Sequence, residues 1–189
     1  QYMLDMANGP VMLIESMDSY LDGDETVSYV TGWQDGERVS VPVADILEEN
    51  SDRRELLHEG MLIQYLINTE ERSRAKTADE REEIILFRVI EDFNRDVLTH
   101  YQTWNYKSNE NSNAKIRVIS GSVAAYDLPN LLIDCGQDAA ASVDDGVNVI
   151  RWNNKTKKAE KATIQDIMRN ENILVRTRYN VTKDIYIFQ

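Results

Sequence analysis

The chain of 189 residues contains 33 acidic and 21 basic side chains, which gives a formal net charge of −12. This charge argues against a general nucleic-acid-binding protein, because such proteins need a basic face that displaces counterions. The single cysteine excludes an intramolecular disulfide, and no apolar run reaches the length of a membrane span.

The first half of the chain contains short runs in which apolar and polar residues alternate, the pattern of half-buried strands. It predicts strands at residues 11–14, from Val27 onward, and at 39–43, 61–68 and 84–90, with a helical turn beginning near Val43. Residues 69–83 are rich in Glu and Arg and predict either a long exposed hairpin arm or a disordered loop. The basic residues of this arm are candidate assembly contacts, namely Arg72, Arg74, Lys76 and Arg81.

An acidic segment connects the first two predicted strands. Asp18, Asp22, Asp24 and Glu25 could offer oxygen ligands to Ca²⁺, and no other cofactor is expected. The carboxylate spacing and the sixth-position glycine of an EF-hand loop are absent. The competing interpretation is a glycine-bearing hairpin turn that is merely acidic.

An aromatic and polar stretch follows the first group of strands. Tyr101, Trp104 and Tyr106 lie close together in it and could form a platform on which sugar rings or bases stack. The alternative is that these residues pack a linker against the neighbouring domains.

The second half predicts strands at residues 116–119, 123–126 and 131–133, and a small-residue loop at 137–146. From Val147 onward the pattern predicts a hairpin, a helical turn around Ile164 and Ile167, and a second hairpin.

Four landmarks recur in the same order in both halves of the chain, which indicates an internal duplication. Each half contains a tryptophan, an Asp-Ile pair and two apolar strands. We therefore expect a mainly β fold of two tandem, duplicated small β-barrel-like domains, each with one short helix. The expected boundaries are residues 10–92 for the first module, 93–113 for the linker and 114–189 for the second module. The landmark pairs are Trp33 and Trp152, Asp45-Ile46 and Asp166-Ile167, residues 60–65 and 172–177, and residues 83–87 and 184–188.

The sequence offers few catalytic signatures. It has no glycine-rich phosphate loop, no nucleophile elbow and no histidine pair at metal-ligand spacing. Asp45 and Asp166 recur in both copies, and we expect them to hold the start of the helical turn or to accept backbone amides beside it. The sequence does not predict an enzyme.

The run from Ile173 to Phe188, Ile-Leu-Val-Arg-Thr-Arg-Tyr-Asn-Val-Thr-Lys-Asp-Ile-Tyr-Ile-Phe, resembles the repeated β modules of large clostridia-like bacterial surface proteins of the S-layer-homology (SLH) type. The turn after Arg-x-Arg-Tyr and the following Lys-Asp-Ile carry this resemblance, which covers the second copy well and the first in outline. The SLH anchoring domain itself is not present. The resemblance implies an extracellular segment of a longer surface-layer or wall-associated protein.

We therefore expect a non-catalytic structural or assembly segment at a bacterial cell surface, which associates with itself or with another surface-layer protein. Two alternatives are a module that binds carbohydrate or a cell-wall polymer and a structural protein of a phage or virion. Neither nucleic acid nor membrane insertion is expected.

Overall fold

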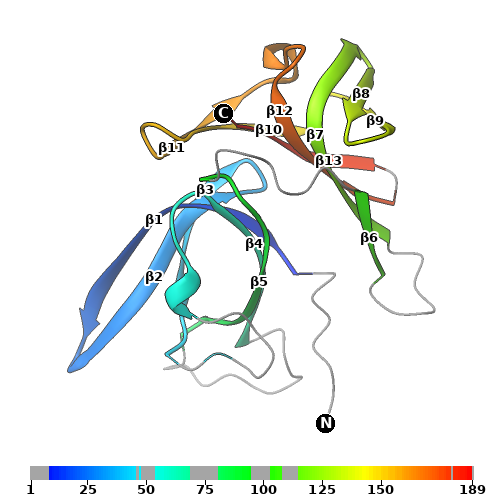
Figure 1. The fold of residues 1–189 in the computed structure, drawn as a ribbon. Helices are drawn as coiled ribbons and strands as arrows, with labels where there is room; N and C mark the ends of the chain where they lie inside the picture. The colour runs from blue at the N-terminus through cyan, green and yellow to red at the C-terminus, as the bar shows by residue number, and fades with distance from the viewer. Residues whose placement is uncertain are drawn as a thin grey trace. The chain divides into compact units, whose positions relative to one another are not determined.

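The computed structural model describes residues 9–45, 47, 54–68, 81–94, 118–179 and 181–188, together with the backbone of residues 103–107 and 115–117. The chain divides into two compact units, residues 1–94 and 95–189. Strands dominate both units (Figure 1), so the prediction of a mainly β fold is confirmed.

The first unit is a closed five-stranded barrel. Its strands pair in the order β1-β2-β3-β5-β4, and β4 returns to pair with β1. All neighbours are antiparallel except β3 and β5, which run parallel through Val43 and Ile84. The order β4-β1-β2-β3 is that of a Greek key. The elements are β1 (Val11–Asp22), β2 (Glu25–Gln34), β3 (Glu37–Val43), the 3₁₀ helix η2 (Arg54–Leu56), β4 (Met61–Ile67) and β5 (Ile84–Asp92).

Alternate residues of these strands fill the barrel. Met12, Ile14, Val30, Ile63 and Phe87 belong to one buried cluster, and their side chains are at most 1% exposed. Residues between these positions point outward, because successive side chains of a strand lie on opposite faces. The outer face of β2 and β3 is mainly polar and aromatic, whereas Leu13 of β1, which lies opposite Trp33, is fully buried.

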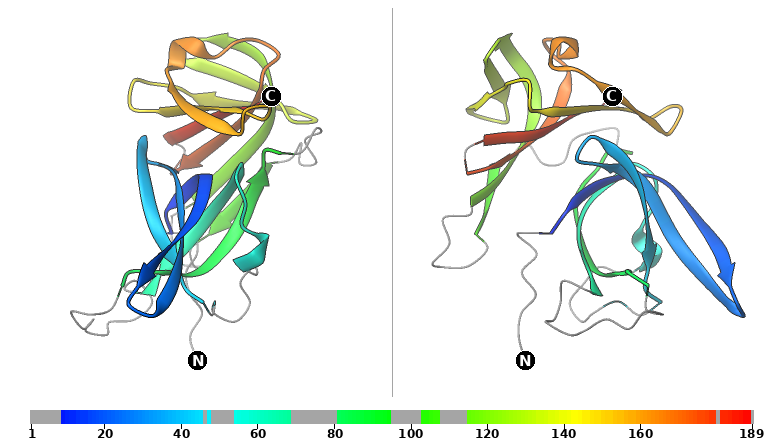
Figure 2. Two further views of the ribbon diagram at one scale, coloured as in Figure 1. Left: turned by 90° about the vertical axis from the view of Figure 1, so that its left-hand side faces the viewer. Right: turned by 180° about the vertical axis from the view of Figure 1, so that it is seen from behind.

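The first strand is longer than its apolar run indicates. The segment from Asp18 to Asp22, expected as part of a connecting turn, is strand, because it pairs with residues 25–29 of β2. Only Gly23 and Asp24 form the turn. Residues 20–22 and 25–27 pair with each other beyond the end of β3 and extend from the barrel as a two-stranded ribbon (Figure 2), called here the β1–β2 ribbon.

The strand β1 contains a bulge next to its closest contact with β2. The register shifts between Ile14 and Ser16, so Glu15 is the extra residue of β1. Gly32 lies opposite this bulge, and a Cβ atom there would lie 2.1 Å from the carbonyl oxygen of Leu13. The close approach of β1 and β2 therefore requires glycine at this position.

The second unit is built on a sheet with the order β11-β10-β13-β12-β7-β8-β9, with β6 paired to β7 off this path. Two expectations from the sequence are corrected here. Residues 103–107, placed in the linker, form β6 and pair with residues 115–119, and residues 138–142, predicted as loop, form β9 against β8. The elements are β6 (Thr103–Lys107), β7 (Lys115–Asp127), β8 (Asn130–Asp134), β9 (Asp138–Ser142), β10 (Asn148–Asn153), β11 (Lys158–Ala162), the 3₁₀ helix η3 (Ile164–Asp166), β12 (Asn172–Arg178) and β13 (Val181–Phe188).

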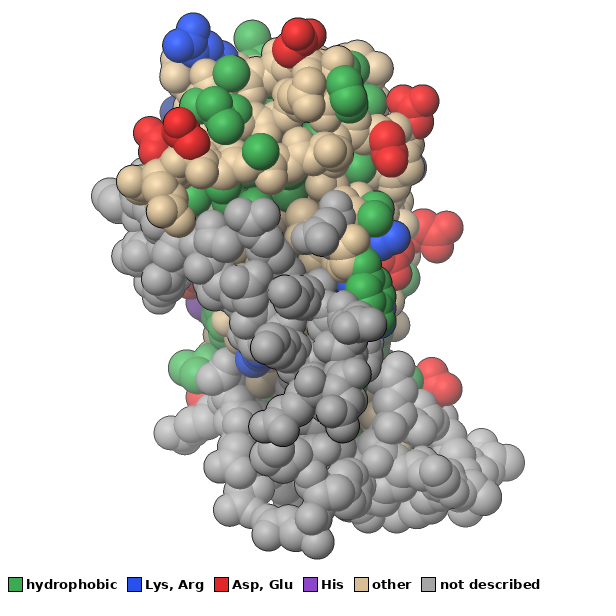
Figure 3. Space-filling model, turned by 90° about the vertical axis from the view of Figure 1, so that its right-hand side faces the viewer, with side chains coloured by type: hydrophobic (Ala, Val, Ile, Leu, Met, Phe, Trp, Pro, Cys, Tyr) green, Lys and Arg blue, Asp and Glu red, His purple; other side chains and the backbone are tan. Residues whose placement is uncertain are grey.

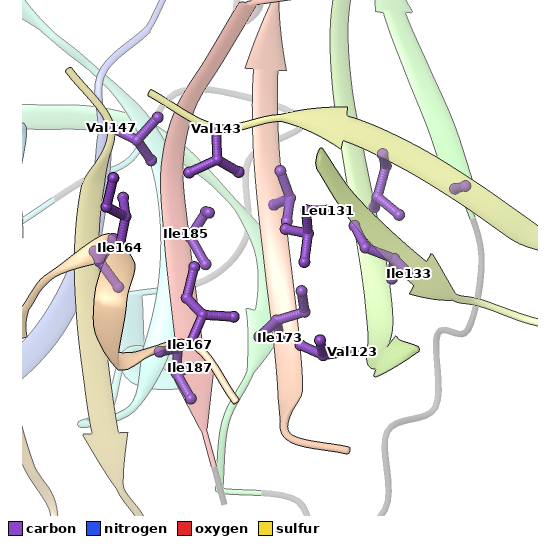
Figure 4. Packing of buried hydrophobic residues seen from close by; sticks show 14 of the residues in the cluster. Val123, Leu131, Ile133, Val143, Val147, Ile164, Ile167, Ile173, Ile185 and Ile187 are labelled. Atoms are coloured by element: carbon purple, nitrogen blue, oxygen red, sulfur yellow. The ribbon is translucent and has the colours of Figure 1, made fainter. Parts of the chain in front are cut away.

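The core of the second unit lies between these strands and η3. Leu131 and Ile133 of β8 point toward Ile173 of β12 and Ile185 of β13 (Figure 4), and all four are at most 1% exposed. Ile164, at the start of η3, covers one side of the same cluster. The predicted order of hairpin, helical turn and hairpin from Val147 onward is confirmed by β10–β11, η3 and β12–β13.

The two units share part of their strand pairing. β12 pairs with β13 and β7, as β4 pairs with β5 and β1. The strands that carry the landmark tryptophans pair differently, since β2 is antiparallel to both neighbours, whereas β10 is antiparallel to β11 and parallel to β13. The internal duplication and the single short helix per domain therefore stay predictions.

Candidate functional site

The outer face of β1, β2 and β3 gathers aromatic and hydroxyl side chains in one row. Tyr29, Thr31 and Trp33 alternate with core residues along β2, so they share this face and span about 13 Å at 3.3 Å per residue. Pro42, Ser40 and Arg38 of β3 lie directly opposite them. Directly opposed residues of antiparallel strands share one face of the sheet. We call this row the β1–β3 face.

A charged group supports Trp33 at one end of the β1–β3 face. The indole Nε1 donates a hydrogen bond to Oε2 of Glu15 at 3.1 Å, and Arg38 pairs with Oε1 of the same carboxylate at 2.9 Å. The guanidinium carbon of Arg38 lies 4.9 Å from the centre of the Trp33 ring, within cation–π range. The bulge at Glu15 makes this arrangement possible, because it turns that carboxylate toward β2.

Two hydroxyl groups occupy the middle of the face. Oγ1 of Thr31 and Oγ of Ser40 lie 2.7 Å apart and form a hydrogen bond across the β2–β3 pair. Each hydroxyl can donate one hydrogen bond and accept others, so the pair has capacity for a further polar partner. Ser40 is exposed on the surface of the barrel.

Two tyrosines border a hollow toward the β1–β2 ribbon. The rings of Tyr20 and Tyr29 are 5.7 Å apart and tilted by 55°. Together with Ser40 and Pro42 they line an open hollow of about 400 Å³. Ser40 and Pro42 also border a second hollow of about 360 Å³, which continues past Val39 to Tyr65 and Ile67.

Arg81 joins the tip of the β1–β2 ribbon to the base of the β4–β5 connection. Its guanidinium pairs with Asp22, with Glu25 at 3.0 Å and with Glu83 at 3.0 Å. The hydrogen bond to Glu25, followed by that to Glu83, raises the pKa of Arg81 above its usual value. Asn68 fixes the backbone around Arg81, since its Nδ2 donates to the Arg81 carbonyl at 2.8 Å and its Oδ1 accepts from the amide of Glu83 at 3.2 Å.

The acidic residues proposed for Ca²⁺ do not converge on one point. Asp18 and Asp22 lie four residues apart on an extended strand, about 13 Å along its length. Asp22 and Glu25 face the Arg81 guanidinium, and Asp24 lies in the turn. Among the residues that the structure describes, no group of three or more His, Cys, Asp or Glu side chains could hold a metal ion.

The residues of the predicted aromatic platform and of the predicted arm do not belong to the β1–β3 face, and several lie outside the described residues. Tyr101 lies outside the described residues, and Trp104 and Tyr106 lie on the β6 backbone, where they pair with Val118 and Ile116. Arg72, Arg74 and Lys76 of the predicted arm also lie outside the described residues, whereas Arg81 makes intramolecular ion pairs. Sequence reasoning missed Tyr20, Tyr29 and Trp33 as a set, although the alternation of Tyr29, Thr31 and Trp33 was a signal of a shared strand face.

Comparison of the chain with family models, with curated proteins and with solved structures finds no match. Within the described part of the chain, no helix is long and apolar enough to cross a membrane.

Proposed function

We propose that the chain is a non-catalytic recognition module whose first unit binds an uncharged oligosaccharide on the β1–β3 face. The observation that carries this proposal is the single row of Tyr20, Tyr29 and Trp33 with the Thr31–Ser40 hydroxyl pair between the aromatic rings. Aromatic rings offer apolar area to the C–H faces of a sugar, and the hydroxyl pair offers hydrogen bonds to its hydroxyl groups.

The architecture of the first unit gives independent support by analogy. A five-stranded Greek-key barrel is the architecture of the OB-fold, in which the face of the second and third strands binds oligonucleotides or oligosaccharides together with the β1–β2 and β4–β5 loops. In this chain the β1–β3 face lies in that position, and Arg81 links the two corresponding connections. Fold alone does not determine function, so the side chains of the face carry the argument.

The charge of the molecule favours a sugar over a nucleic acid. The two arginines near the face, Arg38 and Arg81, are each already paired with carboxylates. Figure 3 draws another side of the molecule, away from β1 and β2, where the described lysines and arginines are scattered among acidic side chains. Asp18, Asp22 and Asp24 lie on the β1–β2 pair and its turn, and their carboxylates would repel phosphate groups.

Calorimetric titration with neutral oligosaccharides tests this function. We expect saturable binding of cellotetraose or chitotetraose and none of a short oligothymidylate. Tyr29→Ala removes one ring from the row and should weaken binding at least about fivefold, the loss typical of a contact that contributes strongly.

Tyr179→Ala is the control, because Tyr179 is a tyrosine on the surface of the second unit, 51% exposed and outside the β1–β3 face. It should leave the affinity unchanged. Equal losses in the two variants, or no binding of either oligosaccharide by the unaltered chain, would reject the β1–β3 face as a carbohydrate site.

A second candidate function is assembly in an extracellular surface layer, in line with the resemblance of residues 173–188 to modules of SLH-type surface proteins. The observation that favours it is Leu21, whose side chain is 75% exposed at the end of the β1–β2 ribbon. A large apolar side chain on a projecting ribbon is suited to contact another molecule. The tandem duplication belongs to this proposal, and the common pairing of β12–β13 with β7 and of β4–β5 with β1 supports it.

Sedimentation over a range of concentrations tests assembly. Self-association that Leu21→Asp abolishes would support the ribbon tip as the contact, whereas Leu128→Asp provides a control at another exposed leucine. A chain that stays monomeric throughout would reject assembly through Leu21.

A further inference from the structure

We infer that Arg81 is a positioning residue that holds the β1–β2 ribbon in the conformation that binds sugar, so that salt controls an otherwise uncharged recognition event. This inference rests on the proposed function of the β1–β3 face. It adds a residue outside that face, on the β4–β5 side of the barrel, and assigns it a role that is distinct from contact with the ligand.

The ribbon needs such a support because its strands have few partners. Among the described strands, residues 20–22 pair with residues 25–27 alone, and a two-stranded hairpin is marginally stable by itself in water. Its tip is exposed, with Leu21 and the turn at Gly23 facing solvent, whereas Val27 at its base is buried. Tyr20, which borders the hollow, belongs to this ribbon.

Within the described part of the chain, Arg81 is the cation that pairs with the ribbon tip. One guanidinium bridges Asp22 and Glu25, on the two strands of the ribbon, to Glu83 at the start of β5. The planar, multiply donating guanidinium suits such bridging, whereas a lysine ammonium acts as a single compact charge. Asn68 anchors the Arg81 backbone to the end of β4, so the guanidinium extends from a fixed base.

The charge balance predicts what happens without Arg81. Three carboxylates surround the one cation, so its removal leaves Asp22, Glu25 and Glu83 repelling one another. The ribbon then moves more freely, and Tyr20 must be ordered again when a sugar binds, at a cost in affinity. The loss should be about threefold to tenfold, the range for ordering one or two side chains.

The dependence on salt has opposite signs in the two proteins. In the unaltered chain added NaCl screens the attraction of Arg81 for the carboxylates, so binding of cellotetraose or chitotetraose weakens as salt rises. In Arg81→Gln the same salt screens repulsion among the carboxylates, so binding strengthens as salt rises. A general loss of folding would not reverse this sign.

The experiment combines titration with either tetrasaccharide at low and high NaCl and hydrogen exchange of the amides of residues 20–27. Arg81→Gln should weaken binding, reverse the salt dependence of binding and accelerate amide exchange in the ribbon. Arg81→Lys should give an affinity and an exchange rate between those of the unaltered chain and those of Arg81→Gln. Arg169→Gln, which removes an equal charge from the surface of the second unit, should behave as the unaltered chain.

Two results would overturn the inference. They are unchanged exchange of the ribbon amides in Arg81→Gln, and a salt dependence that is the same in that variant and in the unaltered chain. If neither tetrasaccharide binds to any form, the carbohydrate function fails by itself, and the exchange measurement still decides whether Arg81 holds the ribbon.

Discussion

The carboxylate of Asp166 closes the turn η3 by accepting two hydrogen bonds from Thr163, one from its amide at 2.7 Å and one from its hydroxyl at 3.0 Å. The sequence predicted a residue that accepts backbone amides at this point, and the structure confirms it. The corresponding prediction for Asp45 has a different outcome, because the structure gives Asp45 an ion pair with Arg54 at 2.9 Å. An aspartate in or beside a helical turn has several partners within reach, and only the local backbone path selects one.

The Asp166 contact should depend on pH. The amide and then the hydroxyl of Thr163 lower the pKa of Asp166 below its usual value. A depressed folded-state pKa means that the contact stabilises the protein above the unfolded pKa and loses this effect as pH falls through the folded pKa. We expect Asp166→Asn to lower the melting temperature at neutral pH, with a difference that shrinks in acid. A difference independent of pH would contradict the role of the charged carboxylate.

Gly32 shows a steric constraint of a single residue. A methyl group on its Cα would meet the Leu13 carbonyl at 2.1 Å, and this backbone cannot withdraw without disturbing the bulge at Glu15. We expect Gly32→Ala to reduce the free energy of unfolding by about 1–3 kcal/mol, the usual cost of forced overpacking. Urea denaturation measures the loss. Gly146→Ala is the control, since its nearest neighbour is a side-chain oxygen of Asp144 at 3.2 Å.

At the scale of elements, β12 and β13 are held together by a buried ion pair as well as by backbone pairing. Arg176 and Asp184 lie directly opposite each other, and Nε and Nη2 of the arginine each lie 2.5 Å from Oδ2 of the carboxylate. Their side chains are 13% and 5% exposed. Asn148 of β10 also approaches Asp184, at 3.5 Å, so this carboxylate lies where three strands meet.

Removing only the arginine should reduce the free energy of unfolding more than removing both charges. Arg176→Met leaves Asp184 buried without its cation and should cost about 3–5 kcal/mol. The double variant Arg176→Met, Asp184→Leu should lose less, because it leaves no buried charge. Chemical denaturation of the single and double variants makes the comparison, and a double variant less stable than the Arg176 single variant would contradict this account.

The strands themselves were predictable from sequence to different degrees. β3, β4 and β5 were expected within a few residues of their observed bounds, because β3 alternates apolar and polar residues and β4 and β5 are nearly continuous apolar runs. The outer half of β1 was missed, since Asp18 and Asp22 gave it the composition of a loop. β9 was missed for a related reason, since its alanines offer no strong strand preference.

At the scale of the whole molecule, two units each have a buried core of their own. The repeat of landmarks suggested this division, but the boundary lies at residues 94 and 95, and β6 belongs to the sheet of the second unit. The landmark tryptophans occupy strands with different partners, Trp33 between two antiparallel strands and Trp152 beside a parallel one. Local similarity of sequence therefore does not imply the same strand pairing.

The sequence by itself determined the mainly β class, the hairpins of the second unit and the charge that argues against nucleic acid, because these follow from local alternation and from composition. The tertiary structure decided the order of strands in the barrel and the row of Tyr20, Tyr29 and Trp33. It also decided that Arg81 pairs with Asp22 and Glu25, which lie more than fifty residues earlier in the chain. Such contacts depend on strand register and bulges, which bring together residues that no local pattern connects.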